Sequence, residues 1–402
     1  MVTTTCFLCS NTKLTRVIDL GFHPLADTFL KEGQLNDPET RYPLNVVRCE
    51  NCGHLMNGYI VPAAARYQEH EYSYDSSNSK VAITHFTDFA KEAVGVVGVT
   101  DKDLVVDVGS NVGTFLSQFR EAANCQVMGV EPSGNIAELA AKNGVPTINN
   151  FFNATAVTEV KKTAKAKLIT GTNVYNHIED QQAFAENVKA LLTEDGMVAV
   201  EMPYAGTLID QTSFDTIYLE HASYFYVSPL KKFWDQHGFN ICKIDLNDYM
   251  GGSMRVYLSR QQPEAPEVAA MIKDEESKGY LKTETYKAFM DRTITFKTDL
   301  MKEQSRIKAE GGVIIGIGAA TKGNTLLNYC GIDSTLLEFV TDASPLKVGK
   351  YTPGSHIPIK HDDDIDKNVI THGLILPWNI GKFLSEKLAP LGIEFLIPQL
   401  KK

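Results

Sequence analysis

Four of the seven cysteines in this 402-residue chain stand in two Cys-x-x-Cys pairs: Cys6, Cys9, Cys49 and Cys52. Two such pairs supply four thiolates, which is the ligand set of a tetrahedral structural zinc site without an open position for catalysis. A redox pair is the alternative, but neither pair lies in a thioredoxin-like βαβ pattern. The remaining cysteines lie in mostly apolar surroundings and are expected to be buried, reduced thiols: Cys125, Cys242 and Cys330.

A glycine-bearing turn follows the apolar segment at residues 104–108 and precedes a helical pattern. Gly109 and Gly113 let the backbone approach a ligand at the carboxyl end of a strand, where open α/β sheets bind cofactors. The next apolar strand ends at Glu131, whose carboxylate can accept hydrogen bonds from both hydroxyls of a ribose. This pattern predicts a nucleoside-containing cofactor, although glycines that only pack a strand-turn-helix unit remain an alternative.

The spacing of the glycines favours S-adenosylmethionine (SAM) over NAD. NAD binding requires G-x-G-x-x-G to seat a diphosphate, whereas this loop has G-x-x-x-G. SAM has no phosphate, and its cationic sulfonium and amino groups suit an adjacent carboxylate such as Asp107. We expect the cofactor to contact Asp107, Gly109, Asn111, Gly113, Glu131, Pro132 and Asn173.

Side chains suited to acid-base chemistry follow two later strands of the same pattern. His177 follows the segment KLITGTN, and Tyr218, Glu220 and His221 follow MVAVEMP. Both segments fall on the carboxyl side of the expected sheet, so these side chains can converge over a cofactor. A histidine that titrates near neutrality, with tyrosine and glutamate, suits removal of a proton from carbon beside a carbonyl. Ordinary structural roles are the alternative for each residue taken alone.

The elements that must position these residues form an α/β multidomain pattern. From residue 104 apolar strands alternate with helices, which predicts a mostly parallel, Rossmann-like sheet covered on both faces. A second α/β pattern begins near residue 313, after a charged segment with helical periodicity. We expect a turn-rich N-terminal zinc module, a central cofactor domain, a helical connector and a C-terminal Rossmann-like domain, at residues 1–66, 67–262, 263–310 and 311–402.

Composition excludes several classes of function. The formal charge of −10 disfavours nucleic acid as a partner. The N-terminus has no basic segment before an apolar run, and no stretch approaches the length of a membrane span. These features predict a cytoplasmic protein without a membrane partner.

The motifs resemble those of the sugar C-methyltransferases, which add a methyl group at C-3' of dTDP-linked 4-keto-6-deoxysugars. The resemblance covers nearly the whole chain through four segments: the four-cysteine set, YSYDSSNSK at residues 72–80, the Glu220-His221 pair, and GIGAATKGNTLLNYCGI with TDASPLKVGKYTPGSHIPI. In the cofactor loop the family often has Cys-Asn-Asp-Gly, whereas this chain has Ser110-Asn111-Val112-Gly113. The resemblance implies a class I SAM-binding domain between a zinc module and a nucleotide-sugar-binding domain.

The resemblance also implies roles for individual residues. His221 is expected to be the general base, in a catalytic cluster with Tyr218, Glu220, His177 and Tyr74. The stretch from Gly316 to Gly323 lacks the third glycine of a dinucleotide fingerprint, and we interpret it as a diphosphate cradle beside Lys322. The residues expected to bind the nucleotide-sugar are Tyr72, Lys322, Asn324 and Tyr351.

The sequence therefore predicts a SAM-dependent C-methyltransferase that forms an enolate at C-3' of a nucleotide-linked keto-sugar. An O- or N-methyltransferase of a similar nucleotide-sugar is the alternative within this class. A noncatalytic nucleotide-binding scaffold and an NAD oxidoreductase also remain open, because fold alone excludes neither.

Overall fold

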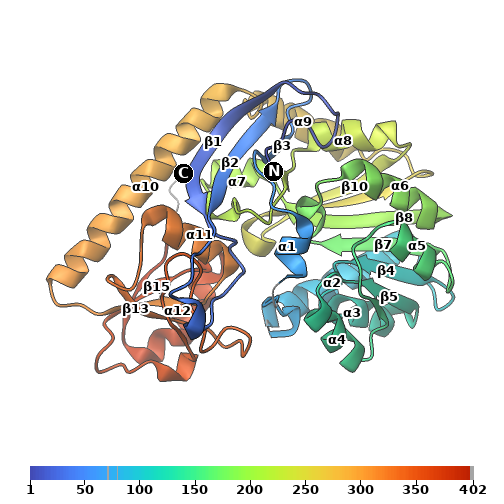
Figure 1. Ribbon diagram of the computed structural model, residues 1–402. Coiled ribbons are helices and arrows are strands. Elements are labelled where there is room, and N and C mark those ends of the chain that lie inside the picture. Colours follow the sequence, from blue (N-terminus) through green and yellow to red (C-terminus); the bar gives the residue numbers. More distant parts are fainter. Residues whose placement is uncertain (70–71, 79, 399–402) are drawn as a thin grey trace.

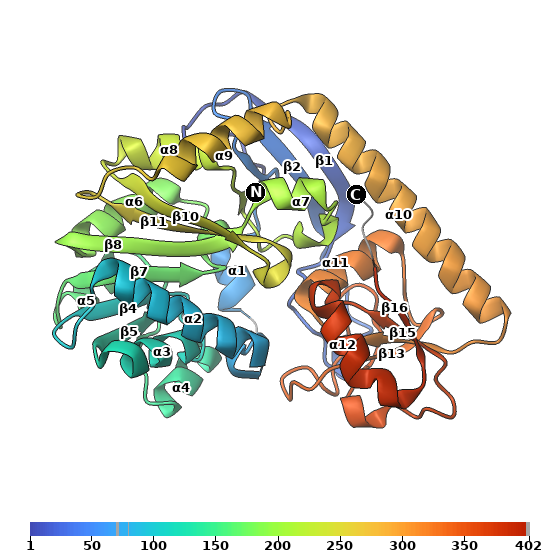
Figure 2. The same ribbon diagram turned by 180° about the vertical axis from the view of Figure 1, so that it is seen from behind.

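The computed structural model describes residues 1–69, 72–78 and 80–398, and its named strands form three sheets (Figures 1 and 2). Ser79 of the YSYDSSNSK segment lies outside the described residues. Seven strands form the central sheet, four form a sheet in the N-terminal module, and five form the C-terminal sheet. The α/β multidomain architecture expected from the sequence is confirmed.

The N-terminal module is built on an antiparallel sheet of β1 (Leu14–His23), β2 (Tyr42–Cys49) and β3 (Leu55–Asn57). The sequence indicated a turn-rich module but did not predict these strands. Register shifts between Arg16 and Ile18 and between Asp19 and Phe22 break the alternation along β1, which hides the strand from a period-two pattern. The fourth strand, β9 (Ser223–Tyr224), belongs to the central part of the chain.

The central sheet has the strand order β10-β11-β8-β7-β4-β5-β6. β4 pairs in parallel with β5 and β7, whereas β11 is antiparallel to β8 and to β10. The chain passes from β4 to β5 and β6 on one side and later to β7 and β8 on the other, which makes a crevice at the carboxyl end of β4. The bounds are β4 (Leu104–Val108), β5 (Gln126–Val130), β6 (Thr147–Ile148), β7 (Ala166–Thr172), β8 (Leu192–Pro203), β10 (Asn240–Asn247) and β11 (Ser253–Ser259).

Alternate residues of the central strands pack on opposite faces of the sheet. Val105 and Leu168 join a buried cluster with the aromatic rings of α2 and α3, whereas Val106 and Ile169 join the cluster that contains α5 and α6. Burial on both faces explains why these strands are continuous apolar runs. The helices of this domain are α1 (Ala63–Tyr67), α2 (Lys80–Val97), α3 (Thr114–Ala123), α4 (Gly134–Lys142), α5 (Ala154–Val160), α6 (Gln181–Leu191), α7 (Ala205–Asp210) and α8 (Val227–Gln236).

Two helices, α9 (Pro266–Ser277) and α10 (Thr283–Ala309), occupy the segment expected to be a helical connector. α10 runs along the outer edge of the molecule, packs against β1, and leads to the C-terminal domain (Figure 1). That domain has a parallel sheet in the order β14-β13-β12-β15-β16. Its elements are β12 (Ile314–Ile317), α11 (Thr321–Cys330), β13 (Leu337–Thr341), β14 (Ile359–Lys360), β15 (His372–Ile375), α12 (Gly381–Leu388) and β16 (Glu394–Leu396).

The N-terminal module contacts both other domains. β3 pairs with β9 of the central domain, and Leu30 bridges to Tyr351 of the C-terminal domain. Both carboxylate oxygens of Glu39 accept from the Gly354 amide, at 2.9 and 3.0 Å. The module therefore touches the two α/β domains at once. Among the helices described, none is long and apolar enough to span a bilayer.

Candidate functional site

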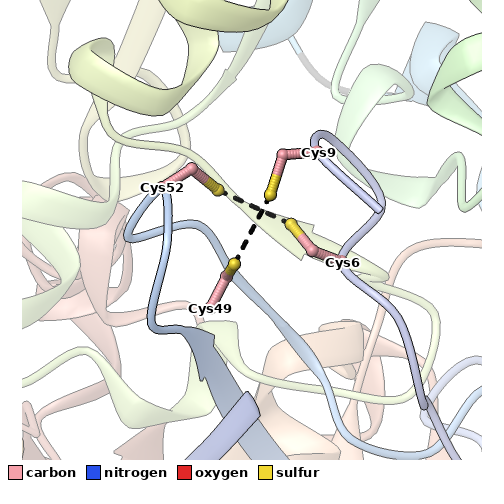
Figure 3. Close-up of side chains that lie close together, drawn as sticks. All are labelled: Cys6, Cys9, Cys49 and Cys52. Atoms are coloured by element: carbon pink, nitrogen blue, oxygen red, sulfur yellow. Dashed lines mark hydrogen bonds between the residues drawn. The ribbon is translucent and has the colours of Figure 1, made fainter. Parts of the chain in front are cut away.

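The four cysteine thiols converge on one point (Figure 3). Their sulfur atoms all lie within 4.8 Å of one another, with 3.6 Å between Cys6 and Cys52 and 3.5 Å between Cys9 and Cys49. A tetrahedral zinc ion with Zn–S bonds of about 2.3 Å separates its ligands by roughly 3.8 Å, so the cluster fits this metal. All four cysteines are free thiols and not disulfides.

Backbone turns aim each pair of thiols. The Ser10 amide donates to the Cys6 carbonyl and the Gly53 amide donates to the Cys49 carbonyl, at 2.9 and 3.0 Å. Both Ser10 and Gly53 have positive φ angles, of 55° and 82°. Such turns point successive backbone groups and thiols inward. The geometry agrees with the metal ligands expected from the sequence.

The metal site lies on the turn that leads into β3, which pairs with β9. Within this pairing the Asn57 side chain donates to the Tyr218 carbonyl at 3.0 Å, and the Asn57 amide donates to the Ala222 carbonyl at 2.9 Å. The Tyr224 hydroxyl donates to Asn57 Oδ1 at 3.0 Å. The N-terminal module therefore holds both ends of the segment that carries Glu220 and His221.

The loop after β4 is held in place by Glu131. Its two carboxylate oxygens accept from the amides of Asn111 and Ser133, at 3.0 and 2.9 Å. Gly109, Asn111 and Gly113 all have positive φ angles, which the glycines adopt without steric cost. A Cβ atom at Gly109 would lie 2.5 Å from Val174, so this glycine also permits close packing. A carboxylate has about four acceptor positions, so Glu131 retains capacity for ribose hydroxyls.

Asp107 is a buried acid that forms no ion pair with any cationic side chain among residues 1–69, 72–78 and 80–398. Thr170 donates to its carboxylate at 2.7 Å. Burial raises the pKa of Asp107 to about 7; the Thr170 hydrogen bond opposes this shift and the negative charge of Glu131 adds to it. Burial also raises the pKa of Glu131. Two desolvated acids at one loop fit a cationic ligand, which agrees with the sulfonium and ammonium groups of SAM.

Asn111 connects the cofactor loop to the Tyr72–Ser76 segment. Its side-chain amide donates to the Tyr74 carbonyl at 2.9 Å and accepts from the Ser76 amide at 3.0 Å. The Tyr72 carbonyl accepts from the side chain of Asn135 at 3.0 Å. The segment therefore lies directly over the loop. Of the other expected cofactor residues, Pro132 accepts a hydrogen bond from the Asn149 side chain through its carbonyl. The backbone amide of Asn173 donates to the backbone carbonyl of Glu201.

The rings of His177, Tyr218 and His221 lie together. The His221 centroid is 4.9 Å from that of His177 and 3.8 Å from that of Tyr218. The structure thus brings together residues 41 to 44 positions apart that follow β7 and β8, as the sequence pattern indicated. Tyr74 lies on the neighbouring segment, where burial raises the pKa of its phenol to about 12.

His221 is buried and neutral. Its Nδ1–H donates to the Thr216 carbonyl at 2.8 Å, which leaves the Nε2 lone pair available. Burial lowers the pKa of His221 to about 3. The expectation that this histidine titrates near neutrality is therefore wrong for the folded protein, because the ring is only 3% exposed.

Tyr67, at the end of α1, was not expected at the site. Its hydroxyl hydrogen-bonds Nδ1 of His177, and its ring packs edge-on against Tyr72. Burial raises the pKa of Tyr67, so the phenol keeps its proton. Burial also lowers the pKa of His177. Only the aromatic cluster around Tyr67 in the sequence hinted at such a position.

Lys322 and Asn324, two of the C-terminal residues expected to bind the nucleotide-sugar, both lie on α11, and Asn324 donates to the Ala26 carbonyl at 2.7 Å. Lys322 donates to the Met250 carbonyl at 3.4 Å and lies over the ring of Trp378. Burial lowers the pKa of Lys322 to about 8, and Asp215 opposes the shift. In the expected diphosphate cradle, the Ala319 amide donates to the Asp342 carboxylate at 2.9 Å. Tyr351 pairs through its backbone with Leu30.

Comparisons with known proteins agree with this architecture. Three family models match: a zinc binding domain at residues 6–67, a methyltransferase domain at 96–244, and a C-methyltransferase C-terminal domain at 248–398. The chain is also 34% identical over 400 residues to the C-methyltransferase NovU of Streptomyces niveus, covering 98% of this chain and 94% of NovU. The chain belongs to the C-methyltransferase family. Its family, SAM as its methyl donor and Zn²⁺ as its metal are those expected from the sequence.

Solved structures provide more remote likenesses. The magnesium protoporphyrin IX methyltransferase of Synechocystis with bound SAM is 14% identical, with 45% of this chain and 82% of that one covered at a TM-score of 0.35. A SAM-dependent methyltransferase of Clostridium acetobutylicum is 12% identical, with 46% and 94% covered at a TM-score of 0.37. The class I methyltransferase fold of this C-methyltransferase rests instead on its strand order and on the family model.

Proposed function

We propose that this C-methyltransferase acts at C-3' of a nucleotide-linked 4-keto-6-deoxysugar of the dTDP type. The observation that supports the proposal is that Nδ1 has a different hydrogen-bond partner in each of two neutral, adjacent histidines, a carbonyl in one and a hydroxyl in the other. His221 donates from Nδ1 to Thr216, whereas Nδ1 of His177 faces the protonated hydroxyl of Tyr67. With Tyr67 as the donor, His221 offers a lone pair at Nε2 and His177 offers a proton at Nε2.

A base beside a proton donor suits enolate chemistry at carbon next to a ketone. His221 removes the C-3' proton, and the Nε2–H of His177 and the hydroxyl of Tyr218 stabilise the charge that develops on the C-4' oxygen. SAM supplies an electrophilic methyl group, which the enolate carbon accepts. The negative charge of the enolate raises the proton affinity of His221 as the reaction proceeds, which offsets its low resting pKa.

The nearby cofactor residues take complementary roles in this proposal. Glu131 binds the ribose hydroxyls, Asp107 balances the cationic charge, and Asn111 fixes the Tyr72–Ser76 segment above the loop. The C-terminal domain binds the nucleotide diphosphate near Lys322, Asn324 and Tyr351. The match of residues 248–398 to a C-methyltransferase C-terminal domain supports this assignment. The enzyme works in the cytoplasm on a small-molecule substrate, without nucleic acid or membrane partners.

Isotope exchange tests the proposed carbon acid directly. Wild-type protein with S-adenosylhomocysteine should wash solvent deuterium into C-3' of dTDP-4-keto-6-deoxyglucose without methylating it. His221→Asn should lose both exchange and methyl transfer by roughly 10²- to 10⁴-fold while still binding both ligands. His237→Asn, at the end of α8, is the matched control and should retain both activities.

Two results would contradict the proposal. Near wild-type exchange in His221→Asn would move the base role to His177 or Tyr218. Methylation of the sugar by the wild-type enzyme at an atom other than C-3' would reject the C-3' position and the keto-sugar mechanism.

A further inference from the structure

Asp27, in the loop after β1, is the point where all three domains meet. Its amide donates to Glu220 Oε1 at 3.1 Å, and its Oδ1 accepts from the Thr321 hydroxyl at 2.9 Å. Its carbonyl accepts from Ser73 at 3.5 Å, and the carbonyl of the preceding residue accepts from Asn324 at 2.7 Å. The N-terminal module therefore inserts one buried acid between the central and C-terminal domains.

Three buried acceptor atoms at this junction have no hydrogen-bond partner within the described part of the chain: Asp27 Oδ2, Glu220 Oε2 and Asn324 Oδ1. Their residues are only 6%, 3% and 1% exposed. A buried acceptor without a donor destabilises the folded state, so an arrangement with three of them indicates a ligand that brings donors. The negative charge of Asp27 also acts on the phenols of Tyr67, Tyr72 and Tyr218, so the acid faces the aromatic cluster.

We propose that the carboxyl groups of Asp27 and Glu220 form one subsite that binds a hydroxyl group of the acceptor sugar. The N-terminal module would then contribute a specificity-determining residue to the active site, besides its zinc. This inference rests on the proposed function, because it takes the acceptor to be a nucleotide-linked sugar.

The protonation of the pair explains why a hydroxyl fits. Burial, together with the negative charge of Asp27, raises the pKa of Glu220 to about 7. Burial likewise raises the pKa of Asp27, while Lys347, Thr321 and Ser73 lower it. Both shifts favour the protonated carboxyl, and a pair of carboxyls that carries one proton both donates and accepts. A sugar hydroxyl has the same two capacities.

The charged and titratable groups that face the pair come from every surrounding element. Arg66 of α1 donates to the Glu220 carbonyl at 3.1 Å, and Lys347 donates to the Ala319 carbonyl at 2.7 Å on the C-terminal side. Neither cation hydrogen-bonds the two carboxylates directly in the described structure. The phenols on which the charge of the pair acts are Tyr67, Tyr72, Tyr74, Tyr218 and Tyr224.

Asp27→Asn tests the subsite, because the amide keeps an acceptor oxygen for Thr321, loses the charge and replaces the unpartnered carboxylate oxygen with an NH2 donor. With dTDP-4-keto-6-deoxyglucose and saturating SAM, the KM for the sugar should rise roughly 10- to 100-fold, the effect of one lost hydrogen bond to a charged group. SAM affinity and zinc content should stay unchanged. The limb of the kcat/KM profile at which Glu220 loses its proton should move to lower pH, because Glu220 loses the repulsion of Asp27.

Two control variants separate this role from a purely structural one. Thr321→Val removes the contact between domains at Asp27 Oδ1 but leaves Oδ2, so its KM for the sugar should stay near wild type. Asp37→Asn changes an exposed acid of the same module and should have no effect.

Equal effects of Asp27→Asn and Thr321→Val on KM, with no shift of the pH profile, would overturn the subsite. Calorimetric binding of the sugar nucleotide separates this failure from failure of the proposed function. Binding by wild type that persists unchanged in Asp27→Asn overturns the subsite alone. Absence of binding by wild type overturns the proposed function and the subsite with it.

Discussion

We expect Asp107 to make the affinity for SAM depend on pH. Its pKa in the cofactor-free protein is raised to about 7, mainly by burial. A cationic ligand favours the ionised carboxylate, so below pH 7 binding must first remove a proton. Affinity should therefore fall as the pH falls. With a pKa of about 7, the ionised fraction of Asp107 in the free protein is about 0.09 at pH 6 and about 0.91 at pH 8. If SAM lowers the pKa of Asp107 below 6 in the complex, binding at pH 8 should be roughly tenfold tighter than at pH 6, a difference of about 1.4 kcal/mol.

Titration calorimetry with SAM at pH 6, 7 and 8, in buffers of different ionisation enthalpy, measures both the affinity and the protons released. About half a proton should be released near pH 7. Asp107→Asn, which keeps an acceptor for Thr170, should bind SAM more weakly and lose most of the slope. Asp101→Asn, at an exposed position just before β4, is the control. A wild-type affinity that is unchanged between pH 6 and 8 would refute the reasoning.

Asp107→Asn, which should weaken SAM binding, should increase the stability of the cofactor-free protein. The pKa of Asp107 rises from 3.8 to about 7 on folding, so the folded protein binds the proton more tightly than the unfolded chain does. The stability contribution of this group therefore falls as the pH rises from 3.8 to 7. Asp107→Asn should raise the melting temperature of the cofactor-free protein at pH 8, which differential scanning calorimetry measures. An unchanged or lower value would mean that the carboxylate is compensated in the folded state.

Two further substitutions test the zinc site and the orientation of His177. Cys49→Ser should leave less than one zinc per chain by metal analysis and lower the melting temperature. Cys242→Ser on β10 should change neither the zinc content nor the melting temperature. Full zinc occupancy in well-folded Cys49→Ser protein would reject the ligand assignment. Tyr67→Phe removes the hydrogen bond to Nδ1 of His177 and should lower kcat about 2- to 13-fold at unchanged SAM affinity. Unchanged kcat, with Tyr59→Phe as the comparison, would remove Tyr67 from the mechanism.

The central fold could be predicted from the sequence because each of its strands is a short apolar segment that can be recognised without knowing its partners. Val105 and Val106 are both buried, on opposite faces of the sheet, so the strand is a continuous apolar run that periodicity detects. The positions of His177 and His221 could be predicted for the same reason, since each follows such a strand. Strand β1 could not, because its register shifts break the alternation.

Asp27 and Tyr67 could not be predicted from the sequence for a different reason. Tyr67 meets His177 across 110 residues, and Asp27 meets Glu220 across 193 residues and Thr321 across 294. No local period relates such partners, and their roles depend on how the domains are placed against one another. The burial that shifts the pKa of His221 is likewise a property of the assembled domains.

The position of the zinc site explains how a metal with four protein ligands and no open coordination position can affect the activity without taking part in the reaction. Zinc fixes the turn between β2 and β3, and β3 pairs with β9. Asn57 of β3 donates to the Tyr218 and Ala222 carbonyls, which lie on either side of Glu220 in the sequence. The same module places Asp27 against the other face of Glu220. Loss of the metal should therefore disturb the segment that carries Glu220 and His221 from two directions. Reconstituting zinc into metal-depleted protein should accordingly restore kcat together with the melting temperature.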